Sequence, residues 1–330
     1  MTASPVAVRI LELFTRPRTL DEAGEALPEF TPGSVRREVA RLERLGFLLP
    51  ARRRRAGVAA QWKGATAAAF FHFATRDLVY RADGERFYRE RLEEERQPPR
   101  FKTYRGLERV PLPPWPGNAA PSLDACLLAR RTARRFSPRP VPFASLAAVL
   151  TGALGQTGWV EDPLLGRQIL KTSPSGGARH PIEGYCLAWN VEGLAPGLYH
   201  YAVKANALER LRRGDFRREA ALFAAGQRWV SGAAFAIVLT AEAARTFWKY
   251  PGDDAYRVLL LDAGHVAQTL CLLATAERLG SFTTAALAET RIERFLRIDG
   301  VREPPLYIVG AGMLSRARTT VTPSTTPRQP

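Results

Sequence analysis

The chain has 330 residues, of which 46% are hydrophobic, and a formal net charge of +16. This length and composition predict a globular protein of two domains with a packed core. The positive charge is spread along the chain, which disfavours a nucleic-acid partner and suits an anionic cofactor or an acidic peptide substrate. A general bias toward arginine would produce the same charge.

The three cysteines, Cys126, Cys186 and Cys271, are far apart and have apolar neighbours. We therefore predict buried thiols, with neither a disulfide framework nor a zinc site. No secretory signal precedes the first amphipathic segment, and the longest continuous apolar run, near Val258–Leu261, is too short to cross a bilayer. The sequence predicts a cytoplasmic protein without a membrane partner.

Residues 1–66 predict a winged helix-turn-helix module. Apolar spacing predicts a helix over 6–14, and Thr19 with Glu22 forms a capping box that begins a second helix. A third helix carries an apolar stripe from Val35 to Leu45. Two short strands are predicted at Phe47–Leu49 and Val58–Trp62, on either side of Arg52–Arg55.

Three roles fit this module. It binds DNA if the third helix enters the major groove and Arg52–Arg55 holds phosphate. It binds a peptide if that peptide adds a strand to the wing. It is purely structural if it packs on the rest of the chain or supports a dimer.

Residues 67–118 predict a connector on the surface or toward a partner subunit, because a proline cluster interrupts regular structure there. Within it, Glu85–Arg96 predicts a charged helix with a solvated face. A second domain is predicted over 119–316. The tail, 317–330, is rich in Thr, Ser and Pro, which predicts disorder.

The second domain combines helices with apolar, strand-like runs. Its long helix, Tyr256–Leu279, is apolar nearly all round, which predicts burial on most faces, and Gly280 is predicted to end it. The other predicted elements are helices at Leu123–Arg131 and Phe143–Leu154 and strands at Gly184–Asn190, Ala234–Thr240 and Tyr307–Gly310.

Two stretches of this domain point to a ligand. The arginine segment (Arg130–Phe136) holds four guanidinium groups, which match phosphate oxygens in a bidentate way, and the hydroxyl of Thr132 adds a donor. The alternative is a solvated charge cluster at a helix end. The glycine turn (Ser175–Gly177) lets backbone approach a flat ligand and offer its N–H groups, or is an ordinary turn.

These stretches resemble motifs of the SagB-type azoline dehydrogenases, a branch of the FMN-dependent nitroreductase superfamily. The arginine segment resembles the signature that holds the FMN phosphate, and the glycine turn resembles the branch's Pro-Ser-Gly-Gly stretch. Three further motifs resemble the branch in the same order: Pro196–Tyr201, Trp248–Tyr250 and Asp262–His265. The resemblance covers residues 68–315.

The resemblance implies an α+β, nitroreductase-like FMN-binding fold, with an antiparallel-rich sheet and helices, that forms a homodimer through the long helix. It implies FMN as cofactor and a heterocyclised peptide as substrate, whose azolines are oxidised to azoles, with a cyclodehydratase as partner. It favours peptide recognition by the winged-helix module. Two alternatives stay open: an NAD(P)H-dependent reductase of small electrophiles, and an inactive peptide-binding scaffold.

The resemblance also implies cofactor contacts. They are Arg130, Arg131, Thr132 and Arg134 for the phosphate, and Ser175, Gly176 and Gly177 for the flavin ring. Ala285 and Ala286 stand where many relatives have a glycine beside the flavin N5 edge. Gly312 and Arg316, expected after the last strand, correspond to a second phosphate contact.

Lys249 and Tyr250 correspond to the branch's catalytic pair. Azole formation removes a proton from carbon together with a hydride, so a side chain must accept the proton. A neighbouring cation favours the phenolate and burial favours a neutral lysine, so either residue is a candidate base. The alternative is a snorkelling lysine beside a packed tyrosine.

The histidines show no metal-ligand spacing. Asp262 and His265 are one helical turn apart, but two ligands do not make a site. We predict a hydrogen-bonded structural pair and no metal.

Overall fold

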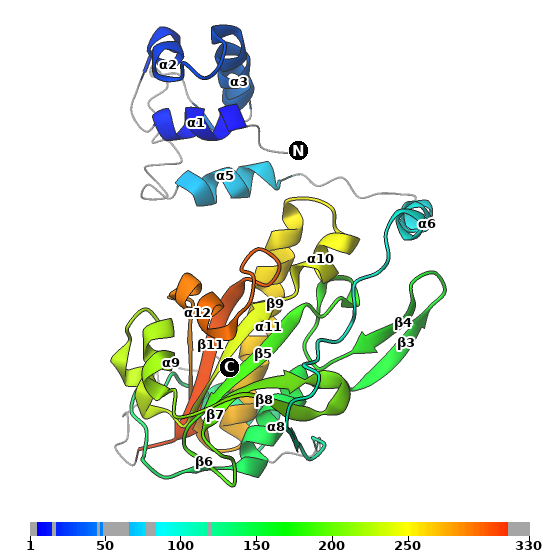
Figure 1. Ribbon diagram of the computed structural model, residues 1–330, viewed down its shortest axis with the longest axis vertical. Helices are drawn as coiled ribbons and strands as arrows, with labels where there is room; N and C mark the ends of the chain where they lie inside the picture. The colour runs from blue at the N-terminus through cyan, green and yellow to red at the C-terminus, as the bar shows by residue number, and fades with distance from the viewer. Residues whose placement is uncertain are drawn as a thin grey trace, which may run out of the picture. The chain divides into compact units, whose positions relative to one another are not determined.

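The computed structural model describes residues 5–14, 18–44, 47–48, 66–76, 84–115, 117 and 121–315. The chain divides into two compact units (Figure 1). The smaller unit comprises Met1–Gly84 and Pro251–Asp254, and the larger comprises Glu85–Tyr250 and Ala255–Pro330.

The smaller unit is helical in its described residues. Its helices are α1 (Pro5–Leu13), α2 (Leu20–Ala26), α3 (Pro32–Arg44) and α5 (Thr66–Ala74). Ile10, Val35 and Leu42 are buried between the first three. The predicted capping box is confirmed, because Thr19 Oγ1 accepts from the Glu22 N–H and the Glu22 carboxylate accepts from the Thr19 N–H.

The hairpin predicted after α3 lies largely outside the described residues. Arg52–Arg55 and Val58–Trp62 lie outside the described residues, while Phe47 and Leu48 pack against the helical core. The three helices are therefore confirmed, and the winged helix stays a prediction. The tail at 317–330 also lies outside the described residues.

Within its described residues, the larger unit contains a seven-stranded antiparallel sheet with the order β1-β8-β7-β5-β9-β11-β10. The strands are β1 (Arg109–Pro111), β5 (Ile182–Ala188), β7 (Gly197–Ala202), β8 (Ala207–Arg213), β9 (Phe235–Ala241), β10 (Leu279–Thr284) and β11 (Pro305–Met313). The antiparallel sheet is as predicted. Its edge strand β1 comes from the stretch expected to be a connector.

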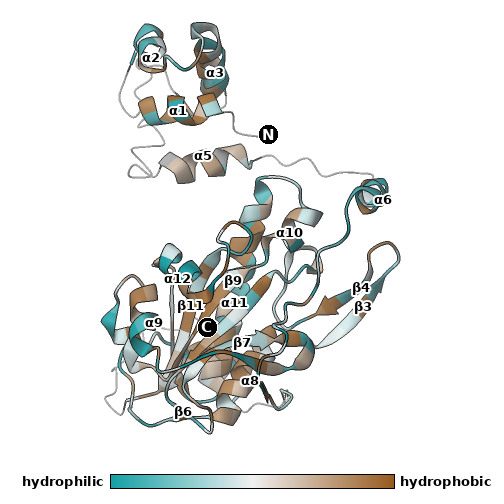
Figure 2. Cartoon of the chain, in the orientation of Figure 1, coloured by the Kyte–Doolittle hydropathy of each residue, from teal (hydrophilic) through white to brown (hydrophobic). Residues whose placement is uncertain are grey.

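Helices cover both faces of this sheet (Figure 1). α8 (Phe143–Leu154) and α11 (Asp254–Ala276) pack on one face, and α9 (Arg217–Phe223) and α12 (Glu289–Leu296) on the other. Residues of the central strands β5 and β9 alternate between the two cores, as a pleated strand requires. Figure 2 shows that the central strands are largely apolar, whereas α12 is hydrophilic on its outside.

The remaining elements are short and surround the sheet. They are α6 (Gly84–Glu94), α7 (Leu123–Ala129), α10 (Ala243–Lys249), the hairpin β3 (Gly158–Asp162) and β4 (Gly166–Leu170), the pair β2 (Val141–Pro142) and β6 (Val191–Glu192), and the 3₁₀ turns η1 (Gly176–Ala178), η2 (Val203–Ala205) and η3 (Arg228–Gly232). The three cysteines are buried free thiols, as predicted.

The long helix begins two residues earlier and ends three residues earlier than predicted. α11 ends at Ala276, because Arg278 adopts a left-handed φ of 60° and Leu279 begins β10. Gly280 therefore lies inside a strand, and its prediction as a helix end was wrong. Although its continuous apolar runs are short, α11 as a whole is long and apolar enough to cross a membrane by length and composition, a test that buried core helices also pass.

α6 has the predicted solvated face, which carries the exposed ion pairs Arg86–Glu90 and Arg89–Glu85, but its other face is packed. Tyr88 stacks on Trp248 of α10, with ring centroids 6.4 Å apart, and Arg91 Nε donates to the Trp248 carbonyl oxygen. Trp248 Nε1 donates in turn to the carbonyl oxygen of Glu95. One face of α6 thus packs on α10, the helix that carries the predicted catalytic pair.

Candidate active site

The glycine turn follows β4 and is held by α11. Ser175 Oγ donates to Asp262 Oδ2 at 2.5 Å, and the Gly176 N–H donates to Asp262 Oδ1 at 3.2 Å. His265 Nδ1 lies 3.2 Å from the Pro174 carbonyl oxygen. Asp262 and His265 therefore each bind this stretch instead of forming the predicted pair with one another. Burial raises the pKa of Asp262, and its bonds to the turn oppose that rise.

The two glycines of the turn are required by packing. A Cβ on Gly176 would lie 2.3 Å from Val258 Cγ1 of α11. Gly177 has a φ of 60°, and a Cβ there would lie 2.4 Å from Lys249 Cδ and 2.8 Å from the Tyr250 hydroxyl. The turn can approach α10 and α11 this closely only without side chains.

Lys249 and Tyr250 lie together on the glycine turn. Lys249 is the last residue of α10 and Tyr250 is its C-cap, so the helix end points both half-buried residues at the turn. Lys249 Nζ donates to the Gly177 carbonyl oxygen at 3.3 Å. Burial lowers the pKa of Lys249, as does the charge of Arg179, while Asp162 acts in the opposite direction.

Arg179, two residues after the glycine turn, was not among the predicted site residues. This buried guanidinium donates to the Gly177 carbonyl oxygen at 3.1 Å and to Gln168 Oε1. It also lies 5.8 Å from the ring centre of Trp248. Arg179 therefore fixes the turn and places a positive charge near Lys249. Its position shortly after two glycines was the one feature of the sequence that could have predicted this role.

A small cavity behind the glycine turn contains a second lysine that sequence analysis missed. Lys171, Ser175, His180 and Asp262 line it. Burial lowers the pKa of Lys171 to about 8, with Glu183 and Arg245 acting in opposite directions. Burial and the Lys171 charge lower the pKa of His180 to about 3, and its Nε2 is 2.9 Å from the Ile169 carbonyl oxygen.

α10 is anchored by a network of buried charges. Arg245 NH1 lies 2.7 Å from Glu183 Oε1, and the other oxygen of Glu183 lies 3.0 Å from His200 Nε2. His200 Nδ1 lies 3.1 Å from Glu209, which also binds Arg109 at 2.8 Å. Burial alone would lower the pKa of His200, but the two carboxylates outweigh it and raise that pKa, which favours the imidazolium form.

The arginine segment crosses the edge of the sheet beside β10 and β11. The Ala133 N–H donates to the Ser281 carbonyl oxygen at 2.8 Å, and the Ser137 N–H donates to that of Met313 at 2.8 Å. Gly280 and Gly312 face each other in β10 and β11. A Cβ on Gly280 would lie 2.7 Å from Ala133 Cβ, and one on Gly312 would lie 3.0 Å from Phe136. The segment lies in the space that these glycines leave.

The guanidinium groups of this segment lack carboxylate partners in the part of the chain that the structure describes. Arg131 NH1 donates to the carbonyl oxygens of Leu128 and Arg130, and Arg134 lies 5.6 Å from the ring centre of Trp229. Arg131, Thr132 and Arg134 are exposed, and Arg130 is half-buried. This donor set suits a phosphate.

The arginine segment and the glycine turn meet the same helix at different levels. Asp262 of α11 binds the glycine turn. Cys271 of the same helix lies near the arginine segment. Burial raises the pKa of the Cys271 thiol, and Ser281 and the charge of Arg130 oppose that rise. Nine residues of helix separate these levels, which is roughly 13 Å. The arginine segment and the glycine turn therefore lie at different positions along α11 and do not contact each other.

The other residues predicted to contact the cofactor differ in where they lie. Ala285 and Ala286 are exposed directly after β10, and the Ala286 N–H donates to Thr284 Oγ1. Gly312 was expected after the last strand, but it lies buried within β11 beneath the arginine segment. Arg316 lies outside the described residues. In the described residues, no group of His, Cys, Asp and Glu could hold a metal ion.

Comparison with known proteins decides the family, because residues 127–313 match the model of the Nitroreductase family. The chain belongs to the nitroreductase family. Nitroreductases are oxidoreductases that typically bind flavin. The matched region contains the arginine segment, the glycine turn, Lys249 and Tyr250.

Three relatives extend this assignment. MJ1384 of Methanocaldococcus jannaschii, named as a nitroreductase, is 30% identical over 190 residues, which cover 58% of this chain and 90% of the relative. Trifolitoxin operon protein TfxC of Rhizobium leguminosarum bv. trifolii is 28% identical, covering 82% of this chain and 79% of the relative. Trifolitoxin-processing protein TfxB of the same organism is 25% identical, covering 88% and 83%.

Solved structures share the fold. A nitroreductase structure from Anabaena variabilis has a TM-score of 0.60 at 24% identity, and the match covers 76% of this chain and 48% of the other. This chain thus spans about half the length of the Anabaena protein. A nitroreductase structure from Ralstonia eutropha has a TM-score of 0.52 at 23% identity, covering 67% and 96%.

Proposed function

We propose that the protein is an FMN-dependent dehydrogenase that oxidises azolines in a heterocyclised peptide to azoles. The observation that carries this proposal is the position of Lys249 and Tyr250, which meet the glycine turn at the end of α10. The order of SagB-type motifs supports it, and so does the similarity to a trifolitoxin-processing protein over most of both chains. We expect a cyclodehydratase as partner, since such an enzyme forms the azoline that this reaction consumes.

The residues present fit FMN. The arginine segment, with Arg130, Arg131, Thr132 and Arg134, would hold the phosphate, because its guanidinium groups have no carboxylate partner among the described residues. The glycine turn and Ala285–Ala286 would contact the ring. Bound FMN would supply the acceptor for the hydride that leaves the azoline.

The chain's own residues take the proton. Because burial and Arg179 lower the pKa of Lys249, its neutral amine forms more readily than that of an exposed lysine. Nζ of Lys249 or the phenolate oxygen of Tyr250 would accept the proton from the azoline ring carbon. Asp262 and Arg179 position the turn that both residues contact.

We also propose that the active form is a homodimer. Large apolar side chains stand exposed on two helices: Leu123 and Leu128 of α7 are 65% and 76% exposed, and Leu260 and Leu261 of α11 are 45% and 55% exposed. Neighbouring exposed apolar residues of this size mark an interaction surface. Sedimentation of the flavin-loaded protein tests this, because a stable monomer with bound flavin would contradict it.

Anaerobic mixing with an azoline peptide tests the proposed function. The purified protein should be yellow and release FMN on denaturation, and the peptide should bleach the flavin absorption band as it becomes an azole. Mass spectrometry should show that the peptide loses two hydrogens. A protein that stays colourless after FMN is added, or a flavin that the azoline does not reduce, would contradict the proposal.

A second candidate function is reduction of small electrophiles with NAD(P)H. The similarity to MJ1384, which is named as a nitroreductase, favours it. Rapid flavin reduction by NAD(P)H without any reduction by azolines would support this candidate. Binding of a heterocyclised peptide by a protein that takes up no flavin would instead indicate an inactive peptide-binding scaffold.

A further inference from the structure

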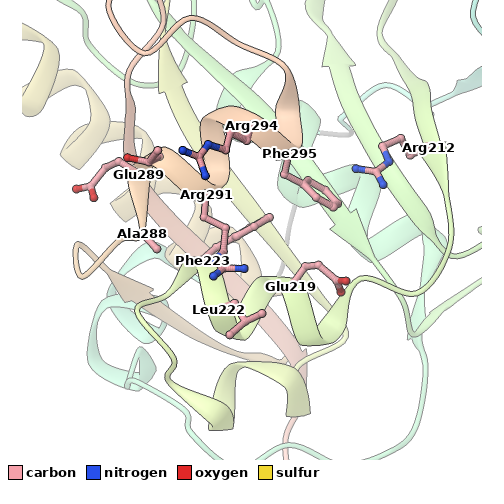
Figure 3. Close-up of a pocket in the computed structure, with 10 residues that line it drawn as sticks. Arg212, Glu219, Leu222, Phe223, Ala288, Glu289, Arg291, Arg294 and Phe295 are labelled. Carbon is pink, nitrogen blue, oxygen red and sulfur yellow. The ribbon is translucent and has the colours of Figure 1, made fainter.

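A groove of about 690 Å³ lies between α9 and α12, on the opposite face of the sheet from α8 and α11 (Figure 3). Its lining residues are Arg212, Glu219, Leu222, Phe223, Ala288, Glu289, Thr290, Arg291, Arg294 and Phe295. This volume is in the range of ligand-binding sites. The groove belongs entirely to the larger unit and contains neither the arginine segment nor the glycine turn.

The groove combines an apolar floor with basic walls. The rings of Phe223 and Phe295 are in edge contact, with centroids 5.1 Å apart, and Leu222 beside them is 39% exposed. The guanidinium of Arg212 covers the Phe295 ring at 4.3 Å. Figure 3 shows Arg291 reaching down from α12 toward Leu222 of α9.

The basic side chains here are available to a ligand. Arg212, Arg291 and Arg294 are exposed, and none has a carboxylate partner in the described ranges of the chain. Figure 3 shows Glu289 pointing away from the groove, while Glu219 of α9 extends along its lower side. The arginines therefore exceed the acidic groups that face the groove.

One end of the groove lies close in the chain to Ala285 and Ala286, which the resemblance assigns to the flavin edge. The Ala288 N–H donates to the Phe223 carbonyl oxygen at 2.9 Å, which fixes the chain after β10 against α9. Ala288 is only two residues beyond Ala286, the exposed position assigned to the flavin edge. A chain lying in the groove could therefore continue into the active site.

We propose that this groove binds an acidic stretch of the peptide substrate, next to the azoline that the active site oxidises. This inference rests on the proposed function and specifies its substrate. Acidic side chains would pair with Arg212, Arg291 and Arg294, and apolar side chains would cover Leu222 and the edge of Phe295. A nucleic acid fits less well, because Phe223 is buried and Arg212 covers Phe295, so neither ring is open for a base to stack on.

Binding of a labelled peptide of alternating glutamate and leucine tests the groove directly, by fluorescence anisotropy on the flavin-loaded protein. The variant Arg212→Gln/Arg291→Gln/Arg294→Gln should weaken binding roughly tenfold or more, as expected for three lost ion pairs. A control that removes three exposed cations elsewhere, Arg105→Gln/Lys204→Gln/Arg278→Gln, should bind as the wild type does. Glu219→Gln should bind more tightly.

Equal losses in the two triple variants would overturn the proposal, because the peptide would then respond only to net charge. Stronger groove-dependent binding of single-stranded poly-dT than of the peptide would overturn it in favour of a nucleic acid. A small azoline without flanking residues separates this proposal from the proposed function. It should reduce the flavin of the wild type and of the groove variant at equal rates. If no azoline, free or within a peptide, reduces the wild-type flavin, the proposed function fails, and the peptide-binding comparison still decides the groove.

Discussion

Two groups of charged side chains in the larger unit differ in how they are neutralised. In the buried network, Glu183, His200 and Arg245 each contact an opposite charge at 3.0 Å or less. In the arginine segment, Arg130 and Arg134 have no carboxylate partner among the described residues. Both groups are rich in charge, but only the charges of the arginine segment are available to solvent or to a ligand.

The difference follows from how an unpaired charge in each group would affect the stability of the fold. A buried charge without a partner is strongly destabilising, so the network must be complete before the sheet and α10 can pack. An exposed guanidinium is solvated and needs no partner for folding. Paired charges should therefore affect stability when they are changed, and unpaired charges should affect ligand binding or chemistry.

The largest expected effect concerns Lys249, whose ammonium contacts a backbone carbonyl oxygen and which we assign to chemistry. Lys249→Met and Tyr250→Phe should keep FMN and the wild-type Tm, while flavin reduction by an azoline peptide slows by roughly 10²–10⁴-fold, as expected when a general base is removed. Stopped-flow absorbance under anaerobic conditions measures this rate. Wild-type rates in both variants would show that the pair is structural.

The next effect concerns a paired charge. Glu183→Gln leaves Arg245 and His200 short of a buried counter-charge, so the free energy of unfolding should fall by about 3–5 kcal/mol. Urea unfolding followed by circular dichroism measures it. The matched control is Glu161→Gln, which removes an exposed partner of Arg167 and should change the free energy by less than about 1 kcal/mol. Similar losses in both variants would mean that burial of the pair does not matter.

The same carboxylate predicts how stability depends on acid. Burial would raise the pKa of Glu183, but Arg245 and His200 outweigh burial and hold that pKa at about 2, below the usual 4.5. A lowered pKa stabilises the folded state above the unfolded-state value, and this contribution is lost as the pH falls from about 4.5 toward 2. The loss should reach about 3 kcal/mol at 25 °C. Unfolding curves of Glu183→Gln between these pH values should show a correspondingly smaller loss.

The smallest expected effect concerns the unpaired arginines. Arg130→Ala/Arg134→Ala should weaken FMN binding roughly ten- to a hundredfold, because charge-assisted contacts to the phosphate are lost. The free energy of unfolding of the flavin-free protein should fall by no more than about 1 kcal/mol, from the lost contact of Arg134 with Trp229. Titration of the apoprotein with FMN, followed by fluorescence quenching, measures the affinity. A variant that binds FMN normally but unfolds more easily would reverse the assignment of the two groups.

Local patterns were sufficient to predict several elements. The capping box at Thr19, the helix Phe143–Leu154 and the apolar strands depend on residues close in sequence, and all are present. The phosphate contact proposed for the arginine segment was likewise inferred from residues close in sequence. The packing of the other face of α6 was missed because the pattern of charges outweighed Tyr88, whose partner Trp248 is distant in sequence.

The buried network could not be predicted from local patterns. His200 is bound by Glu183 and Glu209, and these three residues become neighbours only through the pairing of β5, β7 and β8. The role of Asp262 had the same origin, since its partners Ser175 and Gly176 belong to a turn that packs on α11. Motif order pointed to the candidate site residues but not to their supporting contacts.

The facing glycines of β10 and β11 have a consequence for how mutations at this site should be interpreted. Gly280 and Gly312 leave the room in which Ala133 and Phe136 rest. A methyl group at either position would lift that loop from the sheet and shift the guanidinium groups it carries. A genetic screen for loss of cofactor binding would then return substitutions at these two glycines. Their effect would be indirect, because they would act by changing the position of the arginines.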